Sequence, residues 1–445
     1  MLSQLQKMYF GMARLGPSIM LDMLDLASAL FYFSIQQLPA IYTGISIAVS
    51  YVAIMVSEVT FGNLSDRIPP NRFGRRKPFI MVGAIFMAAS FLFVFTPHLF
   101  IAQGDVLALF LYSLVTMSLF KVSYGMTMTP FQSWMPELTE PEERPSVSSW
   151  QNVANFMGFV AGILGTTLLA TRPETWELPT EVLMMILVFV GIQLGGFIAP
   201  LARLHEGEKF IANPNIVEDL KHALKNPDFV GWMTAQGLLS IGFAMIIKTA
   251  FPYIDDFLLF SDTEFIIFGV ELLIVVFIFF VIWRWMIRNK GKRITLQTAM
   301  MVTVLSLPFT LFITSSIQGF AMIALVGAGV AGYYLFPYII YADFAQKDEL
   351  ETGEGHAGLY TSIPSIPLNL SQALSAFIWG IVFSLPEVLP VPSAPGTFLT
   401  LGYIYWGPIS AIFIFLAVLV LFKVNLDPDF EVLEEQAIAP KTPGG

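Results

Sequence analysis

The sequence predicts an all-α integral membrane protein with twelve transmembrane helices in two six-helix, pseudo-symmetric bundles. Of the 445 residues, 56% are hydrophobic and only 13% are charged, a composition too apolar for a soluble chain of this length. About a dozen stretches contain the roughly 20 mostly apolar residues that a helix needs to cross a bilayer. Polar loop segments also recur at matching places in the two halves, as expected for a repeat-built membrane protein.

The predicted helices follow one another with short connections and fill most of the chain. A longer polar stretch predicts a division into an N-terminal bundle at 1–204, a cytoplasmic linker at 205–228, a C-terminal bundle at 229–423 and a cytoplasmic tail at 424–445. In the eleventh helix, Pro364 and Pro367 predict a kink, because proline removes backbone hydrogen bonds. The predicted helices lie at 14–36, 40–64, 78–101, 105–129, 147–170, 181–204, 229–253, 264–287, 294–316, 318–342, 357–385 and 399–423.

The positions of Lys and Arg predict the orientation, because positively charged loops remain on the cytoplasmic side during insertion. The loops 65–77 and 284–293 are rich in Lys and Arg, whereas the loops on the opposite side contain only Arg172. Both termini are therefore expected in the cytoplasm, and the protein is expected to be a multi-pass protein of the plasma membrane. Asp22 and Asp25 do not suit a cleaved signal peptide, so the first apolar stretch is expected to remain as a helix.

Composition also argues against several classes of protein. The net charge of −10 offers no basic groove, so no nucleic-acid partner is expected. Cysteine is absent, and the four His are not at metal-ligand spacing. We find no phosphate loop and no nucleophile elbow, so neither enzyme activity nor a cofactor or metal is expected. The expected partners are the lipid bilayer and a small-molecule solute, and the protein is expected to act as a monomer.

A basic loop motif follows the second helix and has a shorter counterpart six helices later. Residues 62–67 read GNLSDR and residues 72–78 read RFGRRKP, while RNKGKR stands at 288–293. The first motif resembles the loop signature of the major facilitator superfamily, which implies that fold. Its arginines are expected to pair with acidic groups when the cytoplasmic side closes, although a simple positive-inside function is the alternative. The residues expected to form this gate are Gly62, Asp66, Arg67, Gly74, Arg75, Arg76, Arg144 and Asp343.

Three segments resemble a narrower group, the glycoside, pentoside and hexuronide cation symporters with their melibiose-carrier and sucrose-carrier relatives. They are RFGRRKPF at 72–79, YGMTMTPFQSWMPELTEPEER at 124–144 and YADFAQKDELETGEGHAGLY at 341–360. The resemblance implies that Glu58 matches the second of two acidic residues that help bind the coupling cation in galactoside carriers. Ile54 stands at the first of these positions, and Met128 and Asn152 stand where the family has an aspartate and an arginine. The sodium and galactoside chemistry is therefore not carried over.

Ionisable residues within predicted helices point to a pathway or a partner, because a charge at the bilayer centre costs about 2.5–3.5 kcal/mol on insertion scales. Asp22 and Asp25 lie three apart on one helix face, and Glu58 and Lys121 lie in the second and fourth helices. Two close carboxylates cannot both ionise cheaply, so the group predicts proton coupling in which Lys121 releases the proton. The alternative is a permanent salt bridge that holds the helices together.

The candidate substrate contacts are polar or aromatic residues at the depth of a central cavity. Lys248 is expected to meet either Glu271 or an anionic substrate. For each of the other candidates, helix packing is an equally open interpretation. The full set is Tyr124, Gln132, Asn152, Asn155, Lys248, Tyr334, Asn369 and Gln372.

The sequence therefore predicts a secondary active transporter that moves a sugar or glycoside by alternating access. The coupling ion is expected to be H⁺, with Na⁺ as a second possibility. Alternatives of other classes are a carrier of a lysolipid or other amphiphile and a membrane binding or assembly protein that does not transport.

Overall fold

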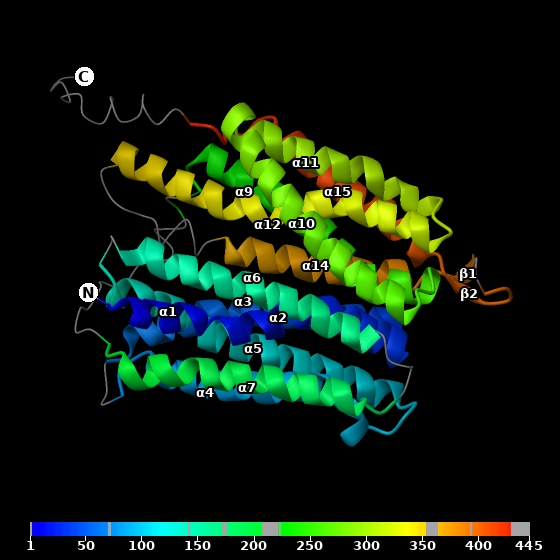
Figure 1. Cartoon of the computed structure of the whole chain (residues 1–445), viewed down its shortest axis with the longest axis horizontal. Helices are drawn as coiled ribbons and strands as arrows, with labels where there is room; N and C mark the ends of the chain where they lie inside the picture. The colour runs from blue at the N-terminus through cyan, green and yellow to red at the C-terminus, as the bar shows by residue number, and fades with distance from the viewer. Residues whose placement is uncertain are drawn as a thin grey trace.

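Twelve helices of the computed structural model are long and apolar enough to cross a membrane. The structure describes residues 2–69, 73–140, 143–170, 176–206, 221, 224–352, 364–391 and 394–428. The helices run side by side in a bundle with two ends (Figure 1). We call the end where α1 (Gln4–Met12) begins and α15 (Gly402–Leu421) finishes the termini end, and the opposite end the hairpin end. The all-α, twelve-span prediction is confirmed.

The first half of the chain contributes six spans to the bundle. After α1, the elements are α2 (Leu15–Ala29), η1 (Leu30–Ile35), α3 (Ala40–Arg67), α4 (Lys77–Val94), η2 (Pro97–Leu99), α5 (Val106–Leu138), α6 (Arg144–Ala170) and α7 (Thr180–Arg203).

The second half contributes the other six spans and a small sheet at the hairpin end. Strands β1 and β2 pair antiparallel within the loop predicted between the last two helices. Before α15, the elements are α9 (Pro227–Pro252), η4 (Tyr253–Phe257), α10 (Asp262–Lys290), α11 (Lys292–Ser306), η5 (Leu307–Leu311), α12 (Ser316–Thr352), α14 (Ser365–Phe383), β1 (Glu387–Pro390) and β2 (Phe398–Thr400).

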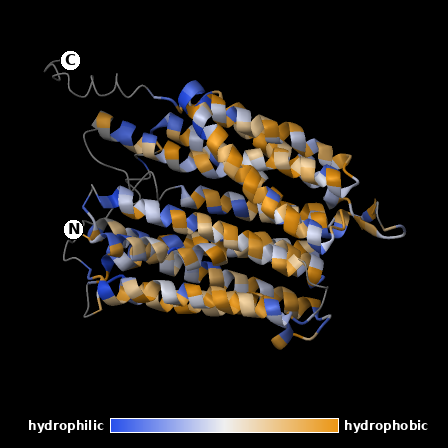
Figure 2. Ribbon diagram, in the orientation of Figure 1, coloured by the Kyte–Doolittle hydropathy of each residue, from blue (hydrophilic) through white to orange (hydrophobic). Residues whose placement is uncertain are grey.

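Hydrophobic residues predominate along the helices, and hydrophilic residues gather toward the ends of the bundle (Figure 2). In α10, Phe277 and Val281 are 61% and 58% exposed. In water such a surface would be unfavourable, but in lipid it is the surface that the solvent requires. Helices suit this environment because they satisfy their own backbone hydrogen bonds.

The first span is longer than predicted and is interrupted. α1 begins at Gln4, whose N-cap Ser3 accepts a hydrogen bond from the Gln6 N–H at 3.2 Å. The helical path changes at Ala13 and Arg14 and continues through α2 into η1. The apolar pattern begins only after Arg14, so the sequence prediction started there.

Both η1 and η4 are π-helical turns, and they occupy matching places at the hairpin end of the first and seventh spans. Each is followed two residues later by a non-glycine residue with positive φ, Gln37 at 56° and Leu259 at 52°. Positive φ costs energy for residues other than glycine, so packing must hold both turns in place. The repeat of this geometry supports the pseudo-symmetry of the two halves.

The kink predicted from Pro364 and Pro367 is not found in the described part of the eleventh span. Pro364 is the N-cap of α14, and Pro367 lies in its first turn. The first-turn N–H groups of a helix have no intrahelical partner, so proline removes no hydrogen bond there.

Small residues allow α6 to approach α2 closely. A Cβ added at Gly158 would lie 2.4 Å from the Ser18 Cβ, and one added at Gly162 would lie 3.0 Å from the Asp22 Cβ. The close approach places Asp22 against the backbone of α6.

The two halves meet along α3 and α14. A Cβ added at Gly44 would lie 2.7 Å from the Ala376 carbonyl oxygen and from the Gly380 Cα. Nearer the hairpin end, the Phe33 ring packs edge-on against Trp379 with centroids 5.5 Å apart. These contacts join the halves over the outer part of the bundle.

A hydrogen-bonded group strengthens this junction. The Ser34 Oγ donates to Asp256 Oδ2 at 2.6 Å, and the Tyr403 hydroxyl donates to the same oxygen. Ser34 belongs to η1 and Asp256 to η4, so the group bridges the two halves. We call Ser34, Asp256 and Tyr403 the hairpin-end latch.

Candidate functional site

A charged cluster lies in the middle of the bundle. Lys121 of α5 donates to Asp25 of α2, with Nζ and Oδ1 2.7 Å apart, and its side chain is only 2% exposed. Asp22 lies one turn earlier on the same helix, close enough to Asp25, Lys121 and Arg14 to interact with their charges. The structure therefore brings Asp22, Asp25 and Lys121 together, and Asp25 is the direct ion-pair partner.

Tyr51 of α3 extends this cluster toward the second half of the chain. The Lys121 Nζ lies 4.1 Å from the centre of the Tyr51 ring, and the Lys248 Nζ lies 5.2 Å from it. The electron-rich face of an aromatic ring attracts ammonium groups at these distances. Tyr51 was not predicted as a site residue, because an aromatic residue in an apolar helix is typical of ordinary packing.

Lys248 does not meet Glu271 in the described part of the chain. Its Nζ donates to the Ala244 carbonyl at 3.2 Å, and no ion pair joins it to a described carboxylate. The side chain is 2% exposed. Of the two predicted partners, Glu271 does not pair with Lys248 among the described residues, and an anionic substrate stays a prediction.

Glu58 links the two halves at the termini side of this cluster. The Asn369 Nδ2 of α14 donates to Glu58 Oε2 at 3.1 Å. Two residues predicted for different roles, cation coupling and substrate contact, are therefore joined directly.

The other predicted substrate contacts occupy varied places. The Asn155 Oδ1 accepts hydrogen bonds from Arg14 Nε at 2.8 Å and Ser18 Oγ at 2.5 Å, so it is engaged within the first half. The Tyr334 ring lies 5.3 Å from that of Phe159, across the two halves. Tyr124 is buried, Gln372 is half-buried, and Gln132 and Asn152 are exposed.

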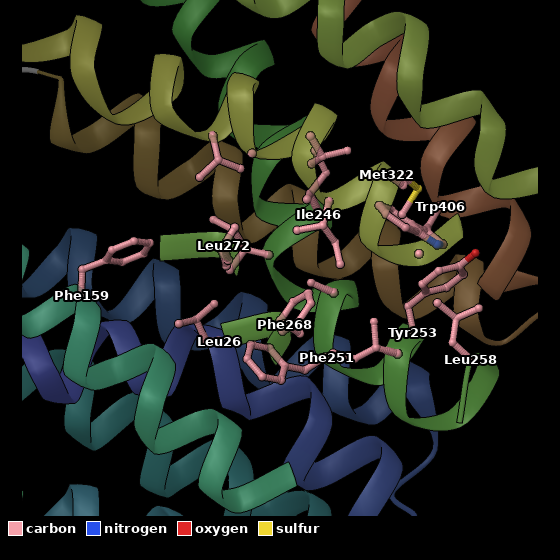
Figure 3. A pocket seen from close by; sticks show the side chains of 18 of the residues that line it. Leu26, Phe159, Ile246, Phe251, Tyr253, Leu258, Phe268, Leu272, Met322 and Trp406 are labelled. Atoms are coloured by element: carbon pink, nitrogen blue, oxygen red, sulfur yellow. The ribbon is translucent and has the colours of Figure 1, made fainter. Parts of the chain in front are cut away.

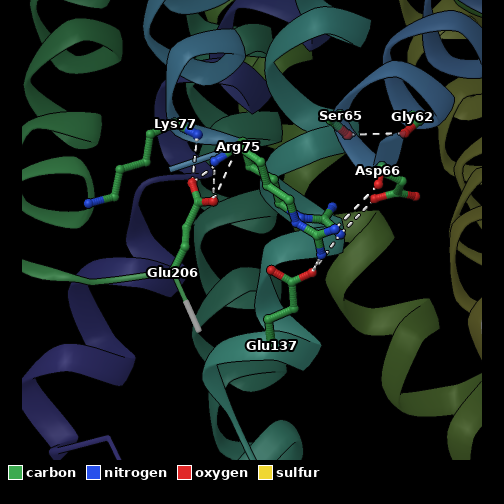
Figure 4. Close-up of polar contacts among 8 residues, drawn as sticks. Gly62, Ser65, Asp66, Arg75, Lys77, Glu137 and Glu206 are labelled. Carbon is green, nitrogen blue, oxygen red and sulfur yellow. Dashed lines mark hydrogen bonds and ion pairs between the residues drawn. The ribbon is translucent and has the colours of Figure 1, made fainter. Parts of the chain in front are cut away.

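The predicted gate residues form a compact network at the termini end (Figure 4). Arg76 Nη2 pairs with Asp66 and with Glu137, each at 2.8 Å, and Arg75 also pairs with Glu137. Glu206 accepts hydrogen bonds from the backbone N–H groups of Arg75, Arg76 and Lys77 at 2.6–3.0 Å. Glu206 thus caps the N-terminus of α4, where a carboxylate is favoured.

The second half repeats this arrangement. Asp427 accepts hydrogen bonds from the N–H groups of Lys292 and Arg293 at 2.6 and 3.1 Å, at the start of α11. The Lys292 Nζ pairs with Asp343 at 2.6 Å. Each capped helix follows a glycine with positive φ, Gly74 at 93° and Gly291 at 83°.

The remaining gate predictions are less connected. Gly62 lies against Thr129, where an added Cβ would be 3.1 Å from Cγ2. Arg67 and Arg144 are exposed, and neither forms an ion pair with another described residue. Next to Arg144, Glu143 pairs instead with Lys7 of α1 at 3.0 Å. The hydrogen bond from Lys7 lowers the pKa of the Glu143 carboxyl below its usual value.

Sequence reasoning did not identify Glu137, Glu206 or Asp427. Glu206 and Asp427 each stand shortly after the last helix of their half, so comparing the two halves could have found them. Their partners lie more than 100 residues away in the chain.

An apolar pocket lies mainly in the second half (Figure 3). Two of its lining residues, Leu26 and Ile247, are the chain neighbours of Asp25 and Lys248. The pocket encloses about 750 Å³, including its opening. Leu26 of α2 and Phe159 of α6 contribute to its wall from the first half. The other lining residues are Ile246, Ile247, Ala250, Phe251, Tyr253, Ile254, Leu258, Phe268, Leu272, Gly319, Met322, Ile323, Val326, Gly327, Val330, Tyr334 and Trp406.

Comparison with known proteins agrees with this architecture. The family described as "MFS/sugar transport protein" matches residues 7–428. An uncharacterized symporter of Synechocystis is 21% identical and covers 92% of this chain and 91% of its own length. The uncharacterized symporter YjmB of Bacillus subtilis is 20% identical and covers 87% of this chain and 85% of its own length.

Solved structures show the same fold. A D-xylose-proton symporter aligns with a TM-score of 0.70 at 15% identity, covering 95% of this chain and 98% of the other. A bacterial homologue of the lysosomal transporter Spinster aligns with a TM-score of 0.69 at 12% identity, covering 96% of this chain and 98% of the other. The fold is therefore that of major facilitator transporters, which are not enzymes. This chain belongs to the MFS/sugar transport protein family.

Proposed function

We propose that this protein is a proton-coupled symporter of a sugar or glycoside that works by alternating access. The observation that best supports the proposal is the ion pair between Lys121 and Asp25 deep in the bundle, beside Tyr51 and Lys248. Such charges are costly in a membrane protein and are usually kept for a pathway. Relatives of this chain bear the name symporter, and a D-xylose-proton symporter shares its fold.

In this mechanism the Asp22 and Asp25 pair carries the proton. When Lys121 contacts Asp25, the pair is stable without a proton. When substrate binding or a conformational change draws Lys121 away, the two close carboxylates take up a proton, because both charges together are unfavourable. The Tyr51 ring contacts Lys121 while Lys121 is bound to Asp25, and Lys248 lies near the same ring.

Glu58 couples this chemistry to the movement of the two halves. Its hydrogen bond with Asn369 crosses from α3 to α14. Opening toward the termini end separates these helices and breaks the bond. Closing re-forms it, so the protonation of Glu58 shifts the balance between the two conformations.

The proposal includes an orientation and a setting. The termini end, which carries the basic loops, faces the cytoplasm, as the positive-inside rule predicts. The protein lies in the plasma membrane and acts as a monomer. The ion pairs around Arg75, Arg76 and Lys292 each lie within one half and hold the helix ends in place on the cytoplasmic side. The hairpin-end latch, which joins the two halves, forms the gate on the opposite side.

A second candidate function is a carrier of an amphiphile such as a lysolipid. The apolar pocket favours it, because a sugar alone gains little from a wall made of Phe, Ile, Leu and Val side chains. In the first candidate function the protein recognises the sugar of the solute, and in the second it recognises the apolar part. A panel of solutes therefore separates them.

The test is uptake into proteoliposomes of labelled glycosides, hexuronides and lysolipids under imposed proton or sodium gradients. We expect glycoside accumulation driven by the proton gradient in wild type, and its loss in Glu58→Gln. Glutamine can still accept the Asn369 hydrogen bond, so only the charge is removed. Glu181→Gln, at the exposed start of α7, is the matched control and should keep full activity. Sodium-driven, gradient-independent or lipid-only uptake would contradict the proposal.

A further inference from the structure

The apolar pocket contains two polar atoms that lack partners. The Tyr253 hydroxyl and the Trp406 Nε1 are fully buried, and among the described residues neither has a hydrogen-bond partner. The two residues are 1% and 2% exposed. A buried donor without a partner costs roughly 1–3 kcal/mol, so an acceptor from a bound molecule would remove this cost.

The arrangement of the pocket gives it two chemically different ends. Tyr253 and Trp406 lie together toward one end, whereas Phe159 and Leu272 lie toward the other (Figure 3). Apart from the two orphaned donors, the lining is almost entirely hydrocarbon. A molecule that fits is therefore apolar along its length and carries a hydrogen-bond acceptor at its far end.

The position of the pocket connects it with the transport site. Leu26 in its wall follows Asp25 of the charged cluster, and Ile247 precedes Lys248. Leu26 and Phe159 belong to the first half, while the rest of the wall belongs to the second. A molecule seated here touches both halves and reaches toward the polar cluster, so its binding changes when the halves move.

We propose that this pocket binds the aglycone of the transported glycoside, an aryl or short alkyl group ending in a hydrogen-bond acceptor. This inference rests on the proposed function. The sugar lies at the charged cluster, and the aglycone extends toward Tyr253 and Trp406.

The first experiment measures binding and uptake separately for one sugar with different aglycones. The ligands are the free sugar and its methyl, propyl, phenyl and 4-methoxyphenyl glycosides. Binding is followed by thermal stabilisation of the full chain in lipid nanodiscs, and uptake in proteoliposomes. We expect affinity to rise about fourfold for each added methylene until the pocket is filled. The 4-methoxy group should add about three- to tenfold over phenyl.

Two sets of variants test the position of the aglycone. Ala250→Leu fills part of the pocket and should abolish the gain in affinity of the phenyl glycoside over the free sugar. Ala321→Leu, on the exposed face of α12, adds the same atoms elsewhere and should keep the gain. Tyr253→Phe and Trp406→Phe keep the apolar wall and should remove only the preference for 4-methoxyphenyl over phenyl.

The outcomes separate this inference from the proposed function. Aglycone-dependent binding that Ala250→Leu removes, without proton-driven uptake, supports the pocket and contradicts the symporter proposal. Proton-driven uptake with equal affinity for every aglycone supports the symporter and overturns the pocket. Binding of the glycosides that Ala250→Leu leaves unchanged also overturns it, and a bilayer acyl chain then fills the space. No binding of any ligand contradicts both.

Discussion

Two lysines from different halves of the chain share one tyrosine ring. The Lys121 Nζ lies 4.1 Å and the Lys248 Nζ 5.2 Å from the Tyr51 centroid. Lys121 also holds Asp25 at 2.7 Å, whereas Lys248 relies on a carbonyl oxygen and the ring. The Tyr51 ring therefore compensates two buried charges of which only one has a carboxylate partner in the described structure.

Replacing the Tyr51 ring should cost more than removing its hydroxyl. Tyr51→Leu loses both cation–π contacts, each worth about 0.5–2 kcal/mol when desolvated. Tyr51→Phe keeps the ring and should stay near wild type in thermal stability. Melting curves in nanodiscs compare the two variants. Equal destabilisation by both would show that the hydroxyl, rather than the ring, is the important group.

The ion pair between Asp25 and Lys121 can be tested for the two predicted roles. Asp25→Asn leaves a buried ammonium without its carboxylate partner and should destabilise by about 3–5 kcal/mol. Lys121→Met should destabilise less, because the Asp25 side chain that it leaves unpaired is 26% exposed. The double variant removes both charges and should recover most of the stability. Proton-driven uptake by the stable double variant would show that the pair is only structural, whereas stability without coupled uptake supports proton coupling.

At the scale of elements, carboxylates from the ends of each half cap helices in the same half. Glu206 follows α7 and caps α4, and Asp427 follows α15 and caps α11. Gly74 makes the first approach possible, because it adopts φ of 93° and an added Cβ would lie 2.5 Å from the Glu206 carboxyl carbon. The basic loop therefore also donates backbone N–H groups to Glu206, in addition to the ion pairs of its charged side chains.

Gly74→Ala should destabilise the protein more than Gly104→Ala. Both glycines have positive φ, 93° and 87°, but no atom lies within 4 Å of an added Cβ at Gly104. The strain of roughly 1 kcal/mol is common to both, and only Gly74→Ala also displaces Glu206. Thermal unfolding measures the difference, and hydrogen exchange at the start of α4 locates it. If the two variants melt alike, the contact with Glu206 is unimportant.

The ion pair between Lys7 and Glu143 ties α1 to the start of α6 and should respond to acid. Its hydrogen bond with Lys7 lowers the pKa of Glu143, so the folded state holds its proton less tightly than the unfolded chain. The stabilisation is therefore complete above about pH 5 and is lost as the pH falls through the lowered pKa.

The difference in melting temperature between wild type and Glu143→Gln should accordingly be constant near neutral pH and shrink in acid. Scans in nanodiscs across this range measure it. Glu181→Gln is the control, since Glu181 forms no ion pair with a described residue. A difference that does not change with pH would show that the charge of Glu143 contributes nothing.

For the whole molecule, the junction between the halves decides which end can open. The hairpin-end latch joins η1 to η4, and Phe33 packs against α14 beside it. At the termini end, the described ion pairs of Arg75, Arg76 and Lys292 remain within one half. Rocking of one half against the other must therefore break the latch.

A cross-link at the latch should stop transport. The chain has no cysteine, so introduced pairs react without background. Ser34→Cys with Asp256→Cys should form a disulfide on oxidation, and reduction should restore uptake. Ser46→Cys with Ser113→Cys, whose native hydroxyls are 2.8 Å apart within the first half, should cross-link without stopping uptake. Full uptake with the first pair oxidised would exclude movement at the latch.

The features that could be predicted from the sequence are those that depend on the composition of a short stretch of residues. The twelve spans follow from composition, since lipid requires a long apolar run whatever its neighbours. Asp25 and Lys121 stood out because charges are rare within such runs. Tyr51 did not stand out, since the residues around an aromatic side chain in an apolar helix do not indicate which residues it contacts in the folded protein. The π-helical turns were missed because one extra residue per turn leaves no pattern in a short segment.

The sequence by itself determined that the protein lies in lipid, how many helices span it and which charged residues lie within those helices. Each of these features depends only on residues close together in the chain. Only the tertiary structure decided that Asp25 rather than Asp22 holds Lys121, that Lys248 avoids Glu271, and that Glu58 meets Asn369. It also decided the caps by Glu206 and Asp427 and the pocket beside Lys248. These depend on contacts between residues often more than 100 apart in the chain, and only the packing of helices brings such residues together.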